Sequence, residues 1–203
     1  MDFAIEKMEK LPADFYYQPV LKTAKRLLGK YFVRRYNGKY LVGKIVETEA
    51  YHQDNDSSCH AHRGKTKRNE VMFGPPGHLY VYFTYGMHYC SNVVCEEENR
   101  AAAVLLRAVE PVAGVEMMQH LRGPKFGLKQ LAAGPARFCQ AFGIGKAENG
   151  ADLFGEEIFI AAGRDEPSEE IVTTTRIGIS SAVELPWRFY LKGNEFVSKP
   201  NRG

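Results

Sequence analysis

Two ionisable side chains lie in segments that otherwise have the composition of β-strands. Arg107 interrupts the apolar run Ala-Val-Leu-Leu-Arg-Ala-Val, and Glu49 belongs to the segment Val-Glu-Thr-Glu-Ala. A guanidinium buried in a strand keeps its proton, so it needs an anionic partner or access to water. We expect Glu49 to be this partner, because both residues lie near strand ends in what we predict to be one sheet. The pair could hold a water molecule with Glu49 as its general base, or it could be an ion pair with a structural role alone.

Glu49 also stands two residues before Tyr51, so both side chains point to the same face of a strand. Glu47 joins this face if the strand is regular to its end. A carboxylate beside an aromatic ring could act as a general base next to a surface for stacking. A solvated strand edge anchored by one tyrosine has the same pattern.

A run of aromatic residues could supply further flat surfaces. The alternation predicts a strand with aromatic side chains on one face and aliphatic ones buried behind it. The faces hold Tyr80, Tyr82 and Thr84, and Leu79, Val81 and Phe83, respectively. Gly86 then turns the backbone and leaves Tyr85 and Met87 at the tip of the turn. Rings beside a protruding side chain could stack on a nucleobase and enter a base stack, but an ordinary amphipathic edge strand also fits.

Histidine and asparagine side chains offer further polar contacts. His60 and His62, with His52 and Cys59 nearby, form only a weak metal-binding pattern, because metal ligands must converge in space. The ring of His60 could instead lie against a base. Asn92 has the amide geometry to contact a base edge, although an asparagine after a strand is also a common turn residue.

The composition allows one domain with a substantial core, since 44% of the 203 residues are hydrophobic. We predict neither a membrane span nor a secretory signal, because no long apolar run and no basic-then-apolar leader is present. The four cysteines match no zinc or paired-disulfide spacing, which favours reduced thiols in the cytosol. The net charge of +3 is small, but one polar segment concentrates basic residues that could contact phosphates or simply be solvated. These residues are Arg63, Lys65, Lys67 and Arg68.

Turn and helix signals predict the α+β class: a single compact domain with a curved, mainly antiparallel sheet and packed helices. Asn37-Gly38 favours a hairpin between strands at residues 31–36 and 39–50, followed by a polar loop over residues 52–70. The other predicted strands are 79–84, 101–109, 157–162, 177–180 and 187–192, and the predicted helices are 19–28, 111–121 and 135–142. Residues 1–15 lack periodicity, and we expect them on the surface.

Three long motifs follow one another along the chain. They are Gly-Lys-Ile-Val-Glu-Thr-Glu-Ala-Tyr, then Lys-Arg-Asn-Glu-Val-Met-Phe-Gly-Pro-Pro-Gly-His-Leu-Tyr-Val-Tyr-Phe-Thr-Tyr-Gly-Met-His-Tyr-Cys-Ser-Asn, and finally Ala-Val-Leu-Leu-Arg-Ala-Val-Glu-Pro. Together they closely resemble the alkyladenine (3-methyladenine) DNA glycosylase family, over about Leu21 to about Lys192. The resemblance implies a DNA glycosylase domain over residues 21–203, preceded by a surface segment over residues 1–20, with no metal or other cofactor.

The resemblance also implies roles for the polar residues. Glu49 matches the general base that activates the attacking water. Arg107 matches the arginine that helps to hold this water, together with a main-chain carbonyl near Ile177.

Roles in base binding and DNA distortion follow in the same way. Tyr51 matches the ring on one side of an extruded base, and His60 and Tyr82 match the other side. Tyr85 stands where the family inserts a side chain into the minor groove, with Met87 beside it. Asn92 matches the residue that limits which purines fit. The basic residues of the polar loop are candidate phosphate contacts, whereas His52 and His62 match no family function.

The implied activity is that of a monofunctional glycosylase in base excision repair. Such an enzyme flips alkylated or deaminated purines out of damaged double-stranded DNA and hydrolyses the N-glycosidic bond, which leaves an abasic site. We expect a monomer that acts in the cytoplasm or at the nucleoid, or in the nucleus of a eukaryote. Two alternatives are a non-catalytic nucleic-acid binding module and a metal-dependent hydrolase that uses His60, His62 and Glu49.

Overall fold

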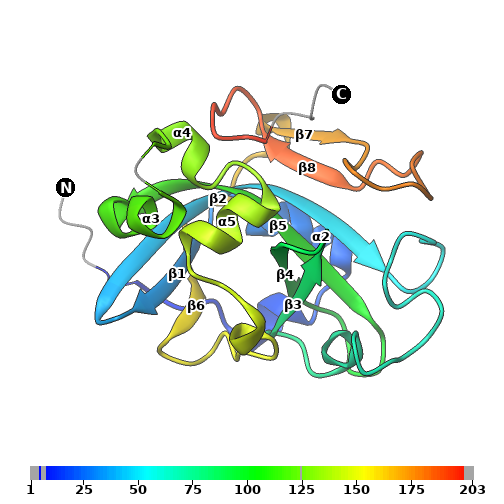
Figure 1. The fold of residues 1–203 in the computed structure, drawn as a ribbon. Coiled ribbons are helices and arrows are strands. Elements are labelled where there is room, and N and C mark those ends of the chain that lie inside the picture. Colours follow the sequence, from blue (N-terminus) through cyan, green and yellow to red (C-terminus); the bar gives the residue numbers. More distant parts are fainter. Residues whose placement is uncertain (1–4, 6–7, 124, 199–203) are drawn as a thin grey trace.

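Eight strands among the described residues form one curved antiparallel sheet (Figure 1). The computed structural model describes residues 5, 8–123 and 125–198. The strands are β1 (Tyr31–Tyr36), β2 (Lys39–His52), β3 (Leu79–Thr84), β4 (His88–Val94), β5 (Ala102–Ala113), β6 (Ile158–Ala161), β7 (Ile171–Thr174) and β8 (Arg188–Leu191). The helices are α1 (Ala13–Tyr16), α2 (Val20–Leu27), α3 (Val115–Arg122), α4 (Leu128–Leu131) and α5 (Pro135–Ala141), with 3-10 turns η2 (Glu70–Phe73), η3 (Lys146–Glu148) and η4 (Ser168–Glu170).

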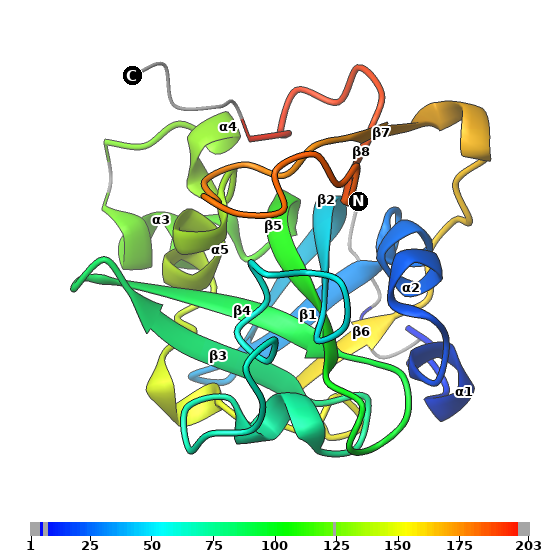
Figure 2. The same cartoon turned by 90° about the vertical axis from the view of Figure 1, so that its right-hand side faces the viewer.

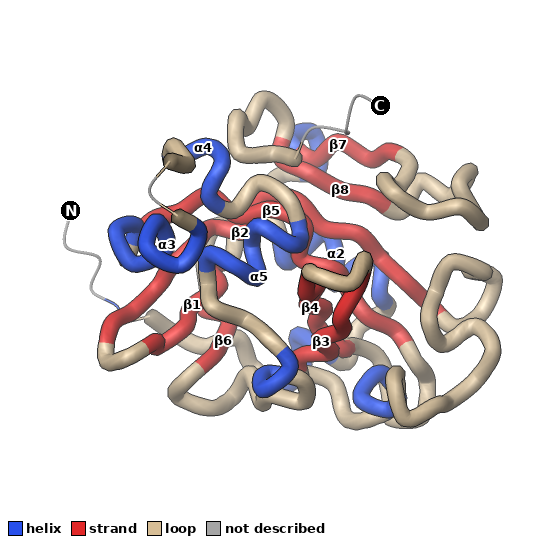
Figure 3. Tube along the Cα trace, viewed as in Figure 1, coloured by secondary structure: helices blue, strands red, loops and turns tan. Residues whose placement is uncertain are grey.

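Strand β2 is the longest and has neighbours on both sides. The order β3-β4-β5-β2-β1-β6 continues from one edge of the sheet to the other, while β8 also pairs with β2 and carries β7 (Figure 3). β1 pairs with residues 39–44 of β2, and β8 pairs with residues 47–49. The second half of β2 therefore lies between β5 and β8.

Local sequence explains the first half of the sheet. Asn37 and Gly38 have φ angles of 48° and 75°, as the predicted β1–β2 hairpin turn requires. The predicted helix after Pro19 is α2, and Gly29 follows it with a φ of 81°. Both predictions are confirmed.

Helices cover the sheet on two sides. In Figure 2, α3 and α5 lie to the left of the strands, and α1 and α2 lie to the right. Phe138 of α5 and Phe142, which follows this helix, pack edge-on against Phe32 of β1, with ring centroids 5.0 and 5.4 Å away. This arrangement confirms the predicted α+β class. None of the described helices is long and apolar enough to cross a membrane.

Two predicted elements differ from the structure. Pro111 does not begin a helix but lies in β5, opposite Gly43 at an irregularity in the β2–β5 register, where a residue without an N–H is tolerated. The helix begins only at Val115, after Gly114 with a φ of 74°. Residues 177–180 form no strand, and the strand of this region is β7 instead.

The expected surface placement of residues 1–15 is wrong for Leu11 and Phe15. Leu11, Phe15 and Tyr16 are buried in the main hydrophobic core, and Phe15 and Tyr16 belong to the short helix α1. A four-residue helix is too short to show a helical period in the sequence. The division of the chain at residue 21 stays a prediction, and residues 1–4 and 6–7 lie outside the described residues.

Candidate active site

A cavity of about 1080 Å³ opens at the centre of the curved sheet. Strands β2 to β5 supply one part of its wall, and the segments at residues 57–60 and 177–181 supply another. Helices α3 and α5 close the remaining side. Its volume is just above the range of about 300–1,000 Å³ that is usual for small-molecule sites.

Strand register brings distant residues onto one face of the sheet. Tyr80 lies opposite Asn92, Asn92 opposite Leu105, and Leu105 opposite Glu49, in a row across β3, β4, β5 and β2. Directly opposed side chains share a face. The predicted aromatic face therefore looks toward Glu49, although Tyr80 itself is buried and Phe83 on the other face is half exposed.

The predicted pairing of Glu49 with Arg107 is confirmed. Arg107 Nη1 lies 3.1 Å from Glu49 Oε1, which also accepts the backbone N–H of Ile177 at 2.9 Å. The Tyr51 hydroxyl donates to Glu49 Oε2 at 2.9 Å. Glu49 is fully buried, but all three of its partners line the cavity.

These contacts leave Glu49 some acceptor capacity. A carboxylate has about four lone-pair positions, two on each oxygen. Arg107 and Ile177 occupy Oε1, and Tyr51 occupies one position on Oε2. One position on Oε2 is therefore left without a protein partner among the described residues.

Arg107 lies between two carboxylates. Its Nε is 3.2 Å from Glu47 Oε1, and the same oxygen is 2.6 Å from Arg188 Nε. Burial acts to lower the pKa of Arg107, but Glu49 and Glu47 outweigh it and hold this pKa above its ordinary value. We call Glu47, Glu49, Arg107 and Arg188 the charged cluster.

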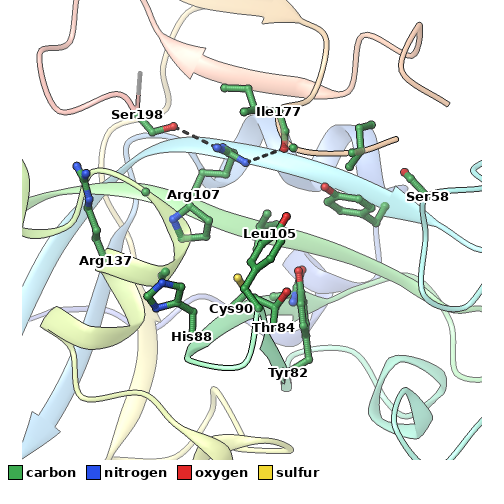
Figure 4. Close-up of a pocket in the computed structure, with 18 of the residues that line it drawn as sticks. Ser58, Tyr82, Thr84, His88, Cys90, Leu105, Arg107, Arg137, Ile177 and Ser198 are labelled. Carbon is green, nitrogen blue, oxygen red and sulfur yellow. Dashed lines mark hydrogen bonds between the residues drawn. The ribbon is translucent and has the colours of Figure 1, made fainter. Parts of the chain in front are cut away.

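The C-terminal segment completes the charged cluster. Ser198 donates its backbone N–H to Glu47 Oε2 at 2.7 Å, and Arg107 Nη2 lies 3.4 Å from the Ser198 hydroxyl. Figure 4 shows Arg107 extending between Ser198 and the carbonyl of Ile177, which is 3.5 Å from Nη1. Because the backbone of Ile177 bonds to these side chains, it is not available to a strand ladder.

Aromatic residues form the walls of the cavity next to the charged cluster. The rings of His60 and Tyr82 meet almost at right angles, with centroids 4.5 Å apart, and His60 Nδ1 is 3.0 Å from the Tyr80 hydroxyl. Tyr51 lines the same cavity. Burial and then Arg68 lower the pKa of His60, so its ring is neutral at neutral pH.

Asn92 lies inside the cavity wall and is not a turn residue. It belongs to β4 and is buried, and its side-chain amide donates to the Tyr80 carbonyl at 3.0 Å.

The tip between β3 and β4 is exposed. Tyr85 and Met87 are 78% and 69% exposed, and Tyr85 has a φ of 50°, which is rare for a residue with a Cβ.

The basic residues of the polar loop do not reach the cavity. All four are exposed, and none forms an ion pair with a described carboxylate. Arg68 comes nearest, with its guanidinium 5.9 Å from the Tyr82 ring and 3.5 Å from the Phe83 carbonyl.

Sequence reasoning missed two further sets of residues. Arg122 and Arg137 line the cavity at the α3–α5 side, and neither forms an ion pair with a carboxylate among the described residues. Arg176 and Asp56 form a buried ion pair next to Tyr51. Neither set has a sequence signal, because the arginines stand in ordinary polar surroundings and Asp56 is 120 positions from Arg176 in the chain.

The histidines do not converge on Glu49. His62 is exposed, with Nδ1 3.2 Å from the Gln53 carbonyl, and His52 is 3.3 Å from Glu96. Within the described residues, no group of three His, Cys, Asp or Glu side chains is arranged to hold a metal ion. The alternative that uses His60, His62 and Glu49 as ligands therefore gains no support from the geometry.

Comparison with known proteins gives one consistent result. A family model described as Methylpurine-DNA glycosylase (MPG) matches residues 14–195. A protein of Carboxydothermus hydrogenoformans named "Putative 3-methyladenine DNA glycosylase" is 59% identical over 190 residues, which are 93% of this chain and 98% of the relative. Proteins of the same name from Chlorobaculum tepidum and Francisella tularensis are each 49% identical, over 97% and 88% of this chain and 94% and 93% of the relatives.

Proposed function

Because this chain belongs to the methylpurine-DNA glycosylase family, we propose that it excises alkylated and deaminated purines from duplex DNA. It hydrolyses the N-glycosidic bond and leaves an abasic site, as the first step of base excision repair. The observation that carries this proposal is the contact of Glu49, Arg107 and Ile177 beside a cavity walled by Tyr51, His60 and Tyr82.

The cavity can receive the target nucleotide only after this nucleotide has left the DNA duplex. The anomeric carbon is shielded inside a duplex, and extrusion costs a few kcal/mol, least for a damaged or poorly paired base. The extruded base stacks between Tyr51 on one side and His60 and Tyr82 on the other. A volume of about 1080 Å³ has room for the sugar as well as the base.

Glu49 acts on a water molecule held at its remaining acceptor position, with Arg107 and the Ile177 carbonyl as further anchors. The water oxygen bonds to the anomeric carbon as the carbon–nitrogen bond breaks, and the bonding pair leaves with the base. The water gives its proton to Glu49. The carboxylate also stabilises the positive charge that develops on the sugar, by analogy with other glycosides.

Alkylation of a purine favours both its binding in the cavity and its departure from the sugar. A purine alkylated on a ring nitrogen is cationic, and a cation on the face of a tyrosine gains about 0.5 to 2 kcal/mol over a neutral base. The neutral ring of His60 adds no opposing charge. Asn92, buried in the wall, restricts which exocyclic groups fit.

DNA is held outside the cavity. Tyr85, with Met87 beside it, enters the gap that the base has left. The basic residues of the polar loop contact phosphates on one side, and Arg122 and Arg137 do so on the other. The DNA-bound unit is a monomer.

The experiment that tests this function is the incubation of the purified protein with methylated duplex DNA and a chelator. We expect release of free methylated purines and an intact strand with abasic sites. Binding without release would favour the non-catalytic module, and loss of release on chelation would favour the metal-dependent hydrolase. A protein–DNA adduct after borohydride treatment would contradict simple hydrolysis, because it requires an amine nucleophile.

A further inference from the structure

Arg176 and Asp56 form a fully buried ion pair that the proposed reaction does not use. Arg176 Nη1 and Nη2 donate to the two oxygens of Asp56 at 2.6 and 2.7 Å, and both side chains are 0% exposed. Such a two-point contact fixes the orientation of the guanidinium as well as its position. Burial acts to raise the pKa of Asp56, but hydrogen bonds from Arg176 and Ser58 outweigh it and hold this pKa below its ordinary value. Asp56 is therefore charged at neutral pH.

The pair connects three segments of the proposed site. Arg176 also donates to the Ala50 carbonyl of β2 at 3.0 Å, next to Tyr51. Asp56 accepts the hydroxyl and the backbone N–H of Ser58 at 2.7 and 3.2 Å, in the loop that continues to His60. Arg176 directly precedes Ile177, whose N–H bonds to Glu49.

The guanidinium of Arg176 lies over the ring of Tyr51. Its central carbon is 4.6 Å from the centroid of the Tyr51 ring. Arg176 is buried and does not line the cavity, whereas Tyr51 does. A base stacked on the cavity side of Tyr51 would thus have a positive charge behind the ring, roughly 8 Å away at ordinary contact distances.

This arrangement matters for a cationic base. At such a separation and an effective dielectric constant of about 20, an uncompensated positive charge would reduce binding of a cation by about tenfold or more. A neutral purine would be affected far less. The carboxylate of Asp56, in contact with the guanidinium, cancels most of this repulsion.

We propose that the Asp56–Arg176 pair is a positioning and specificity element that supports the Tyr51 ring while keeping the charge behind it neutral, so that cationic purines are accepted. This inference rests on the proposed function. A purely structural ion pair would hold the ring equally well, but it would not affect cationic and neutral bases differently.

The test is the ratio of single-turnover excision rates for 7-methylguanine, which is cationic, and hypoxanthine, which is neutral. In Asp56→Asn we expect this ratio to fall by about tenfold, because Arg176 remains charged behind the ring. In the double variant Asp56→Asn/Arg176→Met the ratio should return to the wild-type value, whatever the overall rate. Asp54→Asn changes an exposed carboxylate of the same loop and should leave the ratio unchanged.

A second comparison serves if Asp56→Asn alone does not fold. Asp56→Asn/Arg176→Lys and Asp56→Asn/Arg176→Met differ by one positive charge at the same position. The lysine variant should show the lower ratio. Arg176→Lys alone keeps the neutral pair and should keep the ratio even if both rates fall.

Equal losses for both bases in all variants would overturn the inference and leave the proposed function intact. Unchanged rates in Asp56→Asn would overturn it as well. Absence of purine release by the wild-type protein would overturn both.

Discussion

The charged cluster and the β3–β4 tip differ in burial and in the number of their protein contacts. In the cluster, Glu47 and Glu49 are fully buried, and each carboxylate oxygen has a protein partner. At the tip, Tyr85 and Met87 are mostly exposed, and Tyr85 has an unfavourable backbone conformation. The cluster is therefore organised in the free protein, whereas the side chains of the tip are left mostly without protein contacts. Under the proposed function, the buried cluster would carry out the reaction and the exposed tip would contact the DNA.

The largest effect is expected for Glu49→Gln. The amide cannot take a proton from water, so we expect purine release to fall by about 10²- to 10⁴-fold while affinity for damaged duplex is kept. Single-turnover release and a binding titration with the same DNA measure the two quantities. Glu98→Gln, an exposed carboxyl far along the chain, is the matched control. Retained turnover in Glu49→Gln would remove Glu49 from its proposed role.

Arg107→Ala should affect stability as well as activity. It leaves Glu47 and Glu49 buried without their shared partner, which costs about 3–5 kcal/mol in the free energy of unfolding. Arg100→Ala removes an arginine that is 58% exposed from its ion pair with Glu96, and it should cost no more than about 1 kcal/mol. Denaturant unfolding of both variants gives the comparison. Similar values for the two would mean that the cluster is not stabilised as the contacts indicate.

Tyr85→Ala should affect base extrusion and leave stability almost unchanged. The side chain has few contacts in the free protein, so the free energy of unfolding should change by less than about 0.5 kcal/mol. Base extrusion should become about tenfold less favourable, because a base–aromatic contact is worth about 1–3 kcal/mol. A fluorescent base analogue in the target position reports extrusion directly. Normal extrusion in this variant would refute the insertion of Tyr85.

The smallest effect concerns pH and His60, whose ring contacts Tyr82 of β3. Burial and Arg68 lower the pKa of His60, so the folded protein favours the neutral ring. Stability from this source is complete above pH 6.5 and is lost as pH falls through the lowered pKa of His60. Under the proposed function, protonation would also place a positive charge beside a cationic purine.

We therefore expect release of cationic purines to decline a few-fold more steeply below pH 6.5 in the wild type than in His60→Gln. The glutamine keeps a polar side chain but cannot titrate. Rate profiles of the two proteins measure the difference. If both rate profiles declined equally below pH 6.5, the pH dependence would belong to another group.

Much of the site could be predicted from residue types that are unusual in their sequence context. Arg107 in an apolar strand requires an anion, and Glu49 was the expected one. Asn37-Gly38 predicted the hairpin that carries Glu49, and three motifs indicated the family to which the chain belongs. The roles of the individual residues in the reaction stay predictions.

The remaining features depend on contacts that no local pattern reports. Arg176 and Asp56 are 120 positions apart, and both stand in polar segments. Residues 177–180 have the composition of a strand, but the backbone of Ile177 bonds to Glu49 and Arg107. Pro111 looks like a helix start, but an irregular register lets it remain in β5. The periodicity of a sequence indicates which face of an element is buried. It does not show where side chains, and not a neighbouring strand, bond to the backbone.

The position of Glu49 within β2 has one more consequence. Its backbone pairs with Leu105 on one side and with Arg188 on the other, so two ladders would have to break before this residue could shift. Amide hydrogen exchange there would require a sub-global opening, whereas the tip at residues 84–88 can fluctuate by itself. We therefore expect substitutions in the loops around the cavity to leave the position of Glu49 unchanged.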